Sequence, residues 1–368
     1  MTKKILVTGG LGFIGSHLVD RLVSLGHDVR VLDNLEQQVH HGNMPAHASK
    51  EADIIIGDIR DEETVKNALE DVEVVFHEAA AVGVGQSMYQ ITKYVDVNTL
   101  GTAKLLDAIV NGKYGVRKMI VASSMSIYGE GLYKCGNCGP VTAVRNAEDL
   151  KKHKWEPFCS CGRLVEPLPT PETKKLDSES VYAISKKDQE ELFLSVGKAY
   201  GIPAVALRYF NVYGPRQSLN NPYTGVCAIF SSMLKNNNSP VIFEDGQQTR
   251  DFVSVHDIVS ANILAMDSKK ADYDVFNVGN GHPVSILQIA ETLAKLYNVR
   301  TSPSIKNTFR KGDIRHCYAD ISKIRKIGFE PSMKFGDGMK ELVAWAENEN
   351  AVDASESAMM ELKAKGLA

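Results

Sequence analysis

Residues 3–15, KKILVTGGLGFIG, constrain the fold of this chain more than any other stretch. The apolar run that follows the two lysines is long enough for one β-strand, and it stops at Gly9 and Gly10. Apolar residues at helical spacing then continue from about 13 to 25. A strand, a glycine turn and a helix in this order predict the first βα unit of a parallel sheet, because parallel strands need a crossover between them.

The same alternation continues through most of the chain. We expect helices at about 61–70, 88–111 and 178–200, and further strands at DVRVLD, ADIIIGD, VEVVFHEAA, VRKMIVASS and IPAVALRYF. Several of these strands are nearly continuous apolar runs, as is typical of strands that are covered by helices on both faces. The sequence therefore predicts an α/β fold with a doubly wound parallel sheet of the Rossmann type.

Interruptions of this rhythm predict the domain organisation. One segment is rich in Cys, Gly, Pro and charge, a second polar stretch follows the last predicted strand, and the C-terminal residues resemble a solvated helix. The expected ranges are 1–130, 173–212 and 250–270 for the Rossmann domain, 131–172 for a Cys-rich insert, 213–249 and 271–347 for a smaller substrate-binding domain, and 348–368 for a tail.

The glycine turn predicts a dinucleotide site. Gly9, Gly12 and Gly15 let the backbone approach a pyrophosphate, which then lies at a helix N-terminus where free N–H groups favour an anion. Asp33 ends the second strand, and its carboxylate can accept both adenosine ribose hydroxyls and would repel a 2′-phosphate. We therefore predict NAD rather than NADP. The alternative is a plain tight turn with Asp33 on the surface. Asp58 is expected either to bond the adenine amino group or to cap a helix.

Two later fragments predict proton-transfer chemistry. VASSMSIYG ends the fifth strand with Ser123 and Ser124, and SVYAISK places Tyr182 and Lys186 on one face of a helix. An ammonium about 4 Å from the phenol contributes about 4 kcal/mol at an effective dielectric of about 20, or about three pKa units. We expect this pair to bring the pKa of Tyr182 towards neutrality, where a general base works best. Ser124 is expected to hold the substrate hydroxyl.

Together these motifs resemble a known family. TGGLGFIGSHL, VLDN, GDIRD, HEAA, SSMSIYG, YAISK, LRYFNVYGPRQ and RDFVSVHDI are similar, in this order, to the extended short-chain dehydrogenase/reductases that act on nucleotide sugars. The resemblance runs from residue 3 to about 345, apart from the insert. It implies a Rossmann fold, a catalytic Ser124, Tyr182 and Lys186, and a homodimer packed through helices near 99–111 and 178–199.

The resemblance also implies binding roles by position. Arginine binds phosphate oxygens in a fixed fork, so Arg250 and Arg310 are expected to clamp the substrate diphosphate. The full substrate set is Ser124, Ser126, Asn211, Phe243, Arg250, Arg310 and Asp313. The full NAD set is Gly9, Gly12, Phe13, Ile14, Gly15, Asp33, Asn34, Asp58, Ile59, Ala79, Ala80, Ala81, Asn98, Ser123, Tyr182, Lys186 and Tyr209.

The residues after Ser124 separate the reactions of this family. The 4,6-dehydratases carry an Asp-Glu pair there, whereas this chain has Met125 and Ser126, neither of which can serve as that base. We therefore expect 4-epimerisation of a nucleotide sugar through a 4-keto intermediate, an isomerase reaction. AAAVGVGQSMY and SSMSIYGEGLY resemble the bacterial dTDP-L-rhamnose 4-epimerases most. The alternatives are a UDP-sugar 4-epimerase, a 4-ketoreductase that exchanges its cofactor, and a non-catalytic NAD-binding protein.

Four cysteines lie in the insert, as Cys135-x-x-Cys138 and Cys159-x-Cys161. A long connection of this kind needs something to order it, and we expect its apolar residues to be too few to do so. Four thiolates around Zn²⁺ would form a closed shell with no position for substrate, so the metal would be structural. A disulfide or redox pair and free thiols remain the alternatives. Residues 151–157, KKHKWEP, are expected to be a solvated loop, and Cys227 and Cys317 ordinary thiols.

Composition excludes several other classes. The net charge of −3 gives no electrostatic case for nucleic acid, and no apolar run approaches the length of about 20 residues that spans a membrane. The N-terminal apolar run is too short for a signal peptide, so we expect a cytoplasmic protein. His77 is expected to be structural, and His40 and His41 to be solvated.

Overall fold

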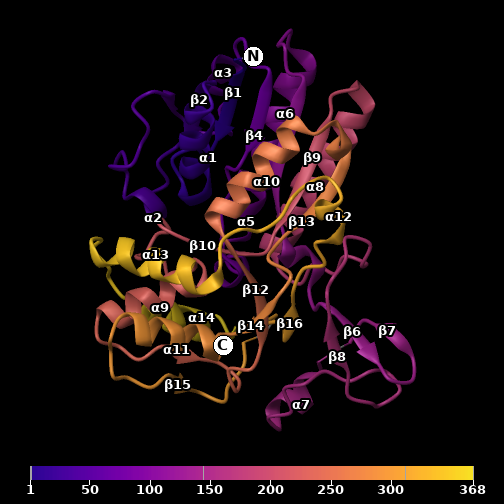
Figure 1. Cartoon of the computed structure of the whole chain (residues 1–368), viewed down its shortest axis with the longest axis vertical. Helices are drawn as coiled ribbons and strands as arrows, with labels where there is room; N and C mark the ends of the chain where they lie inside the picture. The colour runs from indigo at the N-terminus through magenta and orange to yellow at the C-terminus, as the bar shows by residue number, and fades with distance from the viewer. Residues whose placement is uncertain (1, 144, 311, 368) are drawn as a thin grey trace.

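The computed structural model describes every residue of the chain except 1, 144, 311 and 368. Its centre is a parallel sheet of seven strands, in the upper part of Figure 1. The strands, in spatial order, are β13 (Asp274–Val278), β9 (Ala204–Tyr209), β5 (Lys118–Ser124), β4 (Val74–His77), β1 (Lys4–Thr8), β2 (Asp28–Asp33) and β3 (Asp53–Ile56). This order confirms the predicted doubly wound Rossmann sheet.

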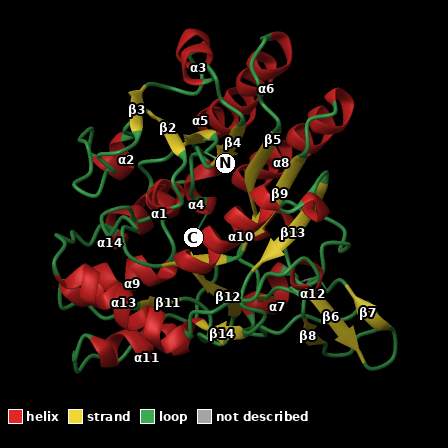
Figure 2. Ribbon diagram, turned by 45° about the horizontal axis from the view of Figure 1, so that its top comes forward, coloured by secondary structure: helices red, strands yellow, loops and turns green. Residues whose placement is uncertain are grey.

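Helices cover both faces of this sheet, as Figure 2 shows. On one face, buried residues of the sheet pack against α1 (Phe13–Ser24) and α10 (Val255–Asp267). On the other face they pack against α3 (Glu62–Ala68), α6 (Gly101–Asn111) and α8 (Val181–Tyr200). Burial on both faces explains why the central strands β4, β5 and β9 are buried along their whole length.

The predicted helix at 88–111 is built from three pieces. α5 (Ile91–Tyr94) leads into a π-helical segment, η1 (Val95–Leu100), which continues as α6. The shorter helices are α2 (Gln37–His40), α4 (Val84–Ser87) and α12 (Ser322–Arg325), with 3₁₀ turns η2 (Met125–Tyr128) and η3 (Lys269–Ala271).

A second, smaller domain carries its own core. Residues of α9 (Val226–Lys235), α11 (Ile286–Leu296) and α13 (Phe335–Glu347) bury one another's apolar faces. Beside them lies a sheet of β10 (Asn211–Tyr213), β12 (Thr249–Ser254), β14 (Pro283–Ser285) and β16 (His316–Cys317), and a pair of β11 (Val241–Ile242) and β15 (Ser304–Ile305). The domain borders differ from the predicted ones, since β12 belongs to this smaller sheet and β13 to the Rossmann sheet.

The Cys-rich insert folds as a small antiparallel sheet at the lower right of Figure 1. Its elements are β6 (Leu132–Cys135), β7 (Gly139–Val141), β8 (Glu166–Leu168) and α7 (Ala147–Lys151). Tyr133, Ala143 and Val165 bury a small core together with two of the cysteines. The expectation that the insert has too few apolar residues to be ordered was therefore too strong, because these few are placed around the cysteines.

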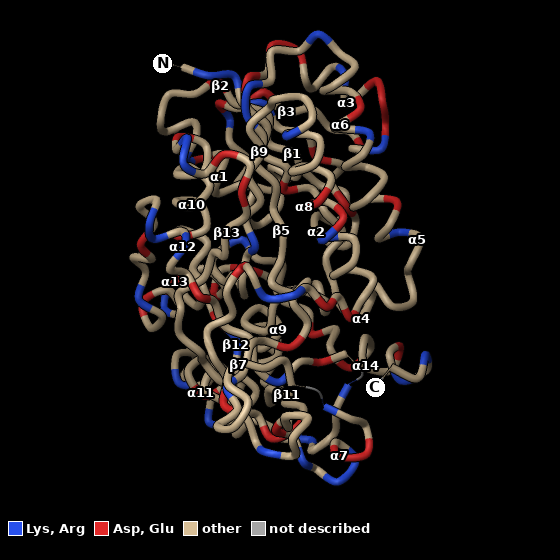
Figure 3. The backbone as a smooth tube through the Cα atoms, turned by 90° about the vertical axis from the view of Figure 1, so that its right-hand side faces the viewer, with Lys and Arg blue, Asp and Glu red and all other residues tan. Residues whose placement is uncertain are grey.

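The C-terminal tail also differs from expectation. It contains the predicted helix, α14 (Ser355–Ala364), but Ala358 and Leu362 are buried rather than solvated. Leu362 lies against Gly85 of α4, and Glu361 accepts a hydrogen bond from the Tyr223 hydroxyl at 2.9 Å. Figure 3 shows α14 beside α4. None of the helices in the described part of the chain combines the length and apolar character that crossing a bilayer requires.

A buried ion pair joins α8 to the centre of the sheet. Arg208 of β9 donates to Glu190 of α8 at 2.5 and 2.9 Å, and both side chains are almost fully buried. Glu190 also accepts from the hydroxyl of Ser123 on β5 at 2.6 Å, and Arg208 donates to the hydroxyl of Tyr128 at 2.7 Å. These contacts fix the helix that carries Tyr182 against the strand that carries Ser124.

We expect Arg208→Ala to lower the free energy of unfolding by about 3–5 kcal/mol, because it leaves the Glu190 charge buried without its partner. Arg117→Ala is the matched control, since Arg117 is 80% exposed and lies 3.6 Å from Glu73. It should change stability by less than about 0.5 kcal/mol. Urea unfolding measures both values. Equal stability of the two variants would contradict this role.

Candidate active site

A cavity of about 470 Å³ opens at the carboxyl ends of the parallel strands. It is lined by most of the predicted NAD set together with the predicted catalytic trio: Gly9, Gly12, Phe13, Ile14, Gly15, Asp33, Asn34, Ile59, Ala79, Ala80, Ala81, Ser123, Ser124, Tyr182, Lys186 and Tyr209. Of the predicted substrate residues, Ser124, Ser126 and Asn211 line the same cavity. The fold thus brings two groups of residues together that are far apart in the sequence.

The glycine turn leaves no room for side chains. Gly9 adopts a φ of +69°, and a Cβ there would lie 2.7 Å from the backbone nitrogen of Ala79. A Cβ on Gly15 would lie 2.2 Å from the carbonyl oxygen of Gly9. Asp33 is held at the edge of this turn, because its carboxylate accepts from the backbone N–H groups of Leu11 at 3.0 Å and Leu35 at 2.9 Å. A turn without side chains lets the backbone approach the diphosphate of NAD, and the oriented Asp33 carboxylate fits its ribose.

His40 lies beside Asp33, which corrects the expectation that it is solvated. Its side chain is only 7% exposed, and Nε2 lies 3.8 Å from a carboxylate oxygen of Asp33. Burial lowers the pKa of His40, which favours the neutral imidazole. His40 is buried because the α2 segment folds back over the end of β2 and lines the cavity. His41 is exposed, as predicted.

Two residues of the predicted NAD set lie outside the cavity lining. Asp58 accepts hydrogen bonds from Arg60 at 2.8 Å and from Asn34 at 3.0 Å, and these bonds hold the pKa of its carboxyl well below the usual range. Asn98 is fully buried in η1, where its side chain accepts from Ala81 N–H at 2.7 Å and donates to the Ala81 carbonyl at 3.0 Å. Asn98 thereby fixes the 79–81 backbone that lines the cavity.

His77 is structural, as predicted. It is fully buried, with Nδ1 2.7 Å from the Thr8 hydroxyl and Nε2 2.8 Å from the Thr102 hydroxyl. Burial lowers its pKa to about 3, with the charge of Lys186 acting in the same direction. His77 therefore stays neutral and ties β1 and β4 to α6.

The predicted catalytic trio comes from two elements, α8 and β5. The Ser180 hydroxyl caps α8 by accepting from the N–H of Ala183 at 3.1 Å, and the helix then presents Tyr182 and Lys186 to the cavity. Ser124 ends β5. Its oxygen accepts from the Ser126 N–H at 3.1 Å and from the Ser126 hydroxyl at 2.9 Å, which leaves its own proton to donate.

The electrostatics of the trio differ from the prediction. Burial raises the pKa of Tyr182, and a hydrogen bond from Ser124 acts only partly against it. Lys186 Nζ donates to Gln189 at 2.6 Å, one turn further along α8, and burial lowers the lysine pKa to about 8. In the protein alone, the phenol is therefore more basic than a free tyrosine, so its proton has to be drawn off by further positive charge.

Sequence reasoning missed an acid in this cavity. Glu78 follows β4, lines the cavity, and accepts from the Tyr209 hydroxyl at 2.8 Å. Burial raises its pKa to about 7, with Tyr209 and Lys186 acting in the other direction. Its position directly after a buried strand was the available signal, because strand ends of a parallel sheet point into one crevice.

The substrate side of the cavity contains two carbonyl oxygens that are ready for a ligand. Asn211 Oδ1 and Gln217 Oε1 are buried and accept no hydrogen bond from the described residues. Buried acceptors without partners are costly, so they point to groups that a bound molecule supplies. Gln217 was not predicted, nor were Asn221, Tyr223, Thr224 and Phe252, which line the same wall.

The other predicted substrate residues lie in or beside a second cavity. Arg310 and Asp313 line it and pair with each other at 2.9 Å, and the Arg310 guanidinium lies 4.7 Å from the centre of the Phe243 ring. Arg250 lines neither cavity. It donates to the backbone carbonyls of Ile314 at 2.6 Å and Arg315 at 3.0 Å.

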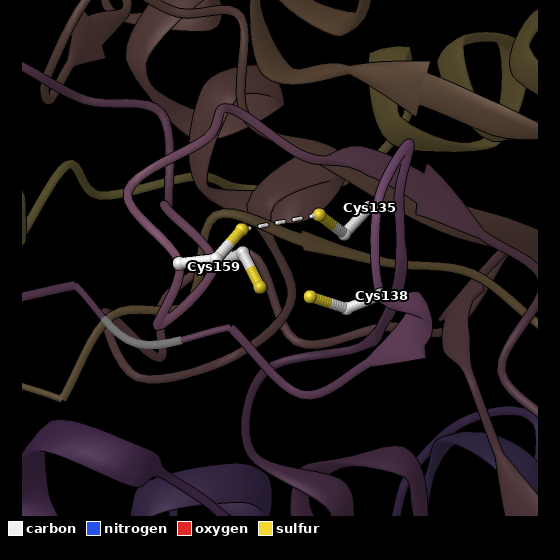
Figure 4. A group of neighbouring side chains, drawn as sticks. Cys135, Cys138 and Cys159 are labelled. Carbon is white, nitrogen blue, oxygen red and sulfur yellow. Dashed lines mark hydrogen bonds between the residues drawn. The ribbon is translucent and has the colours of Figure 1, made fainter.

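The four insert cysteines converge on one point, as Figure 4 shows for those that it labels. All four sulfurs lie within 4.8 Å of one another, and those of Cys135 and Cys161 are 3.6 Å apart. Thiolates around tetrahedral zinc lie about 3.8 Å apart, given Zn–S bonds of about 2.3 Å. Backbone N–H groups of Asn137 and Cys138 lower the pKa of Cys135 to about 6. This donor set fits a structural zinc ion. Cys227 and Cys317 are buried elsewhere, as predicted.

A Rossmann sheet, a glycine turn and a Ser-Tyr-Lys trio in one cavity define the class of nucleotide-cofactor oxidoreductase folds. Comparison with known sequences narrows this class. Residues 5–148 match the NAD dependent epimerase/dehydratase family, and residues 162–342 match a model described as GDP-mannose 4,6 dehydratase. A dTDP-L-rhamnose 4-epimerase of Burkholderia thailandensis is 34% identical, over 94% of this chain and 96% of the relative.

Solved structures agree with the sequence relatives. The UDP-glucose 4-epimerase of Thermotoga maritima, determined with UDP-glucose, is 33% identical with a TM-score of 0.77, over 94% of this chain and 98% of that one. The UDP-glucuronic acid 4-epimerase of Bacillus cereus, determined with UDP-glucuronic acid and NAD, is 28% identical with a TM-score of 0.76, over 94% and 99%. The chain belongs to the NAD-dependent epimerase/dehydratase family, among relatives named as nucleotide-sugar 4-epimerases.

We expect Gly15→Ala to abolish NAD retention, because the added methyl would collide with the Gly9 carbonyl. Gly336→Ala is the control, since nothing lies within 4 Å of a Cβ there and Gly336 is in a helix, α13. Cofactor released from acid-denatured protein is measured for both variants. Normal NAD content in Gly15→Ala would show that the turn does not hold the dinucleotide.

Proposed function

We propose that this protein is an NAD-dependent 4-epimerase of a nucleotide sugar, and that its substrate is of the dTDP-L-rhamnose/dTDP-6-deoxy-L-talose type. The observation that carries the reaction is the shared cavity, in which Ser124, Tyr182 and Lys186 face the same space as the glycine turn and Asp33. The family membership supports it, since three relatives with this architecture are named as 4-epimerases.

The chain's own groups can carry the proton half of the reaction. Once its own proton has been drawn off, Tyr182 acts as a phenolate and takes the proton of the sugar O4, and Ser124 donates a hydrogen bond to the same oxygen as it becomes a carbonyl. NAD would be held by the glycine turn and Asp33, and it would supply the hydride acceptor for C4 and a positive charge. Asn211 and Gln217 offer their unpartnered carbonyl oxygens to hydroxyls of the sugar as it turns.

Dehydration is the reaction that the site disfavours. The two residues after the catalytic serine are Met125 and Ser126, and neither side chain carries a carboxylate. Met125 is buried, and the Ser126 hydroxyl donates to Ser124. Glu78 is a carboxyl in the cavity, but it is engaged as the acceptor of a hydrogen bond from the Tyr209 hydroxyl. The residues at these positions favour epimerisation over the 4,6-dehydration that the description of the second family model names.

The lining of the large cavity supports a 6-deoxy sugar over a uronic acid. Its described cations are Lys93 and Lys186, with His40 near Asp33. Lys93 pairs with Glu36 at 2.8 Å and Lys186 bonds Gln189, so neither is left to bind a C6 carboxylate. A UDP-sugar 4-epimerase remains the second candidate, because the relatives named above include UDP-glucose and UDP-glucuronic acid enzymes.

A 4-ketoreductase and a non-catalytic NAD-binding protein are the other rivals. Asp33 at the ribose position weighs against NADPH, the usual reductant. The presence of Ser124, Tyr182 and Lys186 in the cavity weighs against a protein that binds NAD without catalysis. An epimerase retains its NAD and turns over with none added, whereas a reductase consumes reduced cofactor in step with product.

A homodimer is also proposed. Ile91, Val95 and Leu100 along α5 and η1 are exposed, as is Ile184 on the neighbouring α8. Apolar side chains gathered on two adjacent helices favour burial against a second copy of the chain.

We expect Tyr182→Phe to lower kcat at least about 1,000-fold while NAD content stays within about two-fold, because only the proton-transfer group is lost. A panel of dTDP-, UDP- and GDP-sugars, scored for 4-epimer products, identifies the substrate on which the variant is measured. Full activity of Tyr182→Phe would contradict the mechanism.

We further propose that the four cysteines hold one structural Zn²⁺. Metal analysis of chelator-washed protein should find about one zinc per chain in the wild type and in Ser160→Ala, and little in Cys161→Ser. Ser160 and Cys161 are exposed neighbours in the same turn, so they form a matched pair. Wild-type protein without zinc would overturn this site.

A further inference from the structure

The insert is fastened to two loops of the substrate-binding domain by buried charges. Arg145 of the insert donates to Glu130 at 3.1 Å, to Glu244 at 2.5 Å and to the backbone carbonyl of Asp313. The side chains of Arg145, Glu130 and Glu244 are all less than 10% exposed. Buried charges of this kind hold only one geometry well, so they fix the insert in register with the loops at 244 and 313.

A second set of charged residues also joins the insert to the substrate-binding domain. Arg315 is almost fully buried and donates to Glu156 of the insert at 2.8 Å and to Asp245 at 2.7 Å. Glu156 also bonds His316 at 3.0 Å. Trp155, next to Glu156, is buried and stacks on His153. The 151–157 segment, expected to be a solvated loop, is therefore partly a docking surface for residues 315–316.

Between the insert and these loops lies the second cavity, of about 280 Å³. The insert supplies Thr142, Ala143, Arg145, Ala147 and Leu150 to its wall. The opposite wall is formed by Glu130, Asp177, Glu179, Phe309, Arg310, Gly312 and Asp313. Glu179 lies only three positions before Tyr182, which lines the large cavity, so both cavities border the start of α8.

The chemistry of this second cavity favours a nucleoside rather than a phosphate. Its described lining contains four carboxyl groups, on Glu130, Asp177, Glu179 and Asp313, but only two guanidinium groups. Carboxylates accept hydrogen bonds from ribose hydroxyls and base N–H groups and repel phosphate oxygens. Phe309 in the lining, and Phe243 beneath Arg310, add aromatic faces for a base.

We propose that the Cys-rich insert forms one wall of the subsite for the nucleoside end of the substrate, so that Ala147 and its neighbours help to select the nucleotide. This inference rests on the proposed function, which requires a nucleoside diphosphate sugar. The catalytic trio then lies in one cavity and the base and ribose in the other, whose wall includes Arg310. The cysteine cluster holds the wall in place and takes no part in the chemistry.

The test uses an exposed position, so that folding is not at stake. Ala147→Trp places a bulky side chain into the cavity from the exposed start of α7. Glu148→Trp adds the same side chain one residue further on, at an exposed position outside the cavity lining. Binding of dTDP and of UDP is measured by calorimetry for full-length, NAD-loaded wild type and both variants, together with KM, kcat, NAD content and zinc content.

We expect Ala147→Trp to raise the Kd of dTDP or UDP and the substrate KM at least about ten-fold, with kcat, NAD and zinc within about two-fold of wild type. Glu148→Trp should match the wild type. Equal Kd and KM in both variants, with normal wild-type turnover, would overturn this inference and leave the proposed function intact. A wild type that binds neither nucleotide and epimerises no sugar would overturn both.

Discussion

The buried contact between Glu190 and Arg208 is the interaction on which the site depends. It joins α8 to β9, and through the Ser123 hydroxyl it also reaches β5. Tyr182 lies on α8 and Ser124 ends β5, so the separation of these two side chains in the cavity is set by a charge pair within the sheet core. A pair removed from water is costly to break, which gives the site a rigid base. Loops of the smaller domain then close the other side of the cavity.

Electrostatics divides the work between the protein and its cofactor. Burial keeps the phenol of Tyr182 protonated at neutral pH, since it raises the pKa of a group that is neutral when protonated. Burial lowers the pKa of Lys186 to about 8, and its ammonium group donates a hydrogen bond to Gln189. We propose that the positive nicotinamide of bound NAD would supply the further charge that the phenol needs to lose its proton. This arrangement would keep the base inactive until NAD is in place.

The sequence predicted the sheet, the glycine turn and the trio because each depends on local chemistry at a strand end or on one helix face. Gly15 and Asp33 are recognisable since few residues fit their places. The other features of the site depend on the tertiary structure and could not be predicted from the sequence. Lys186 turns towards Gln189 rather than to the phenol, and His40 folds back over Asp33, because packing outweighs spacing. Glu78, Gln217 and the docking of Arg145 depend on segments that only tertiary structure brings together.

The central claim is that one cavity removes the hydrogen at C4 of the sugar and gives the same hydrogen back. The most direct measurement follows deuterium placed at C4 of the substrate that the sugar panel identifies, with the product epimer analysed by mass spectrometry and NMR. The account predicts that the product keeps the deuterium at C4 and takes up none of the solvent hydrogen there. A product whose C4 hydrogen comes from solvent would contradict it.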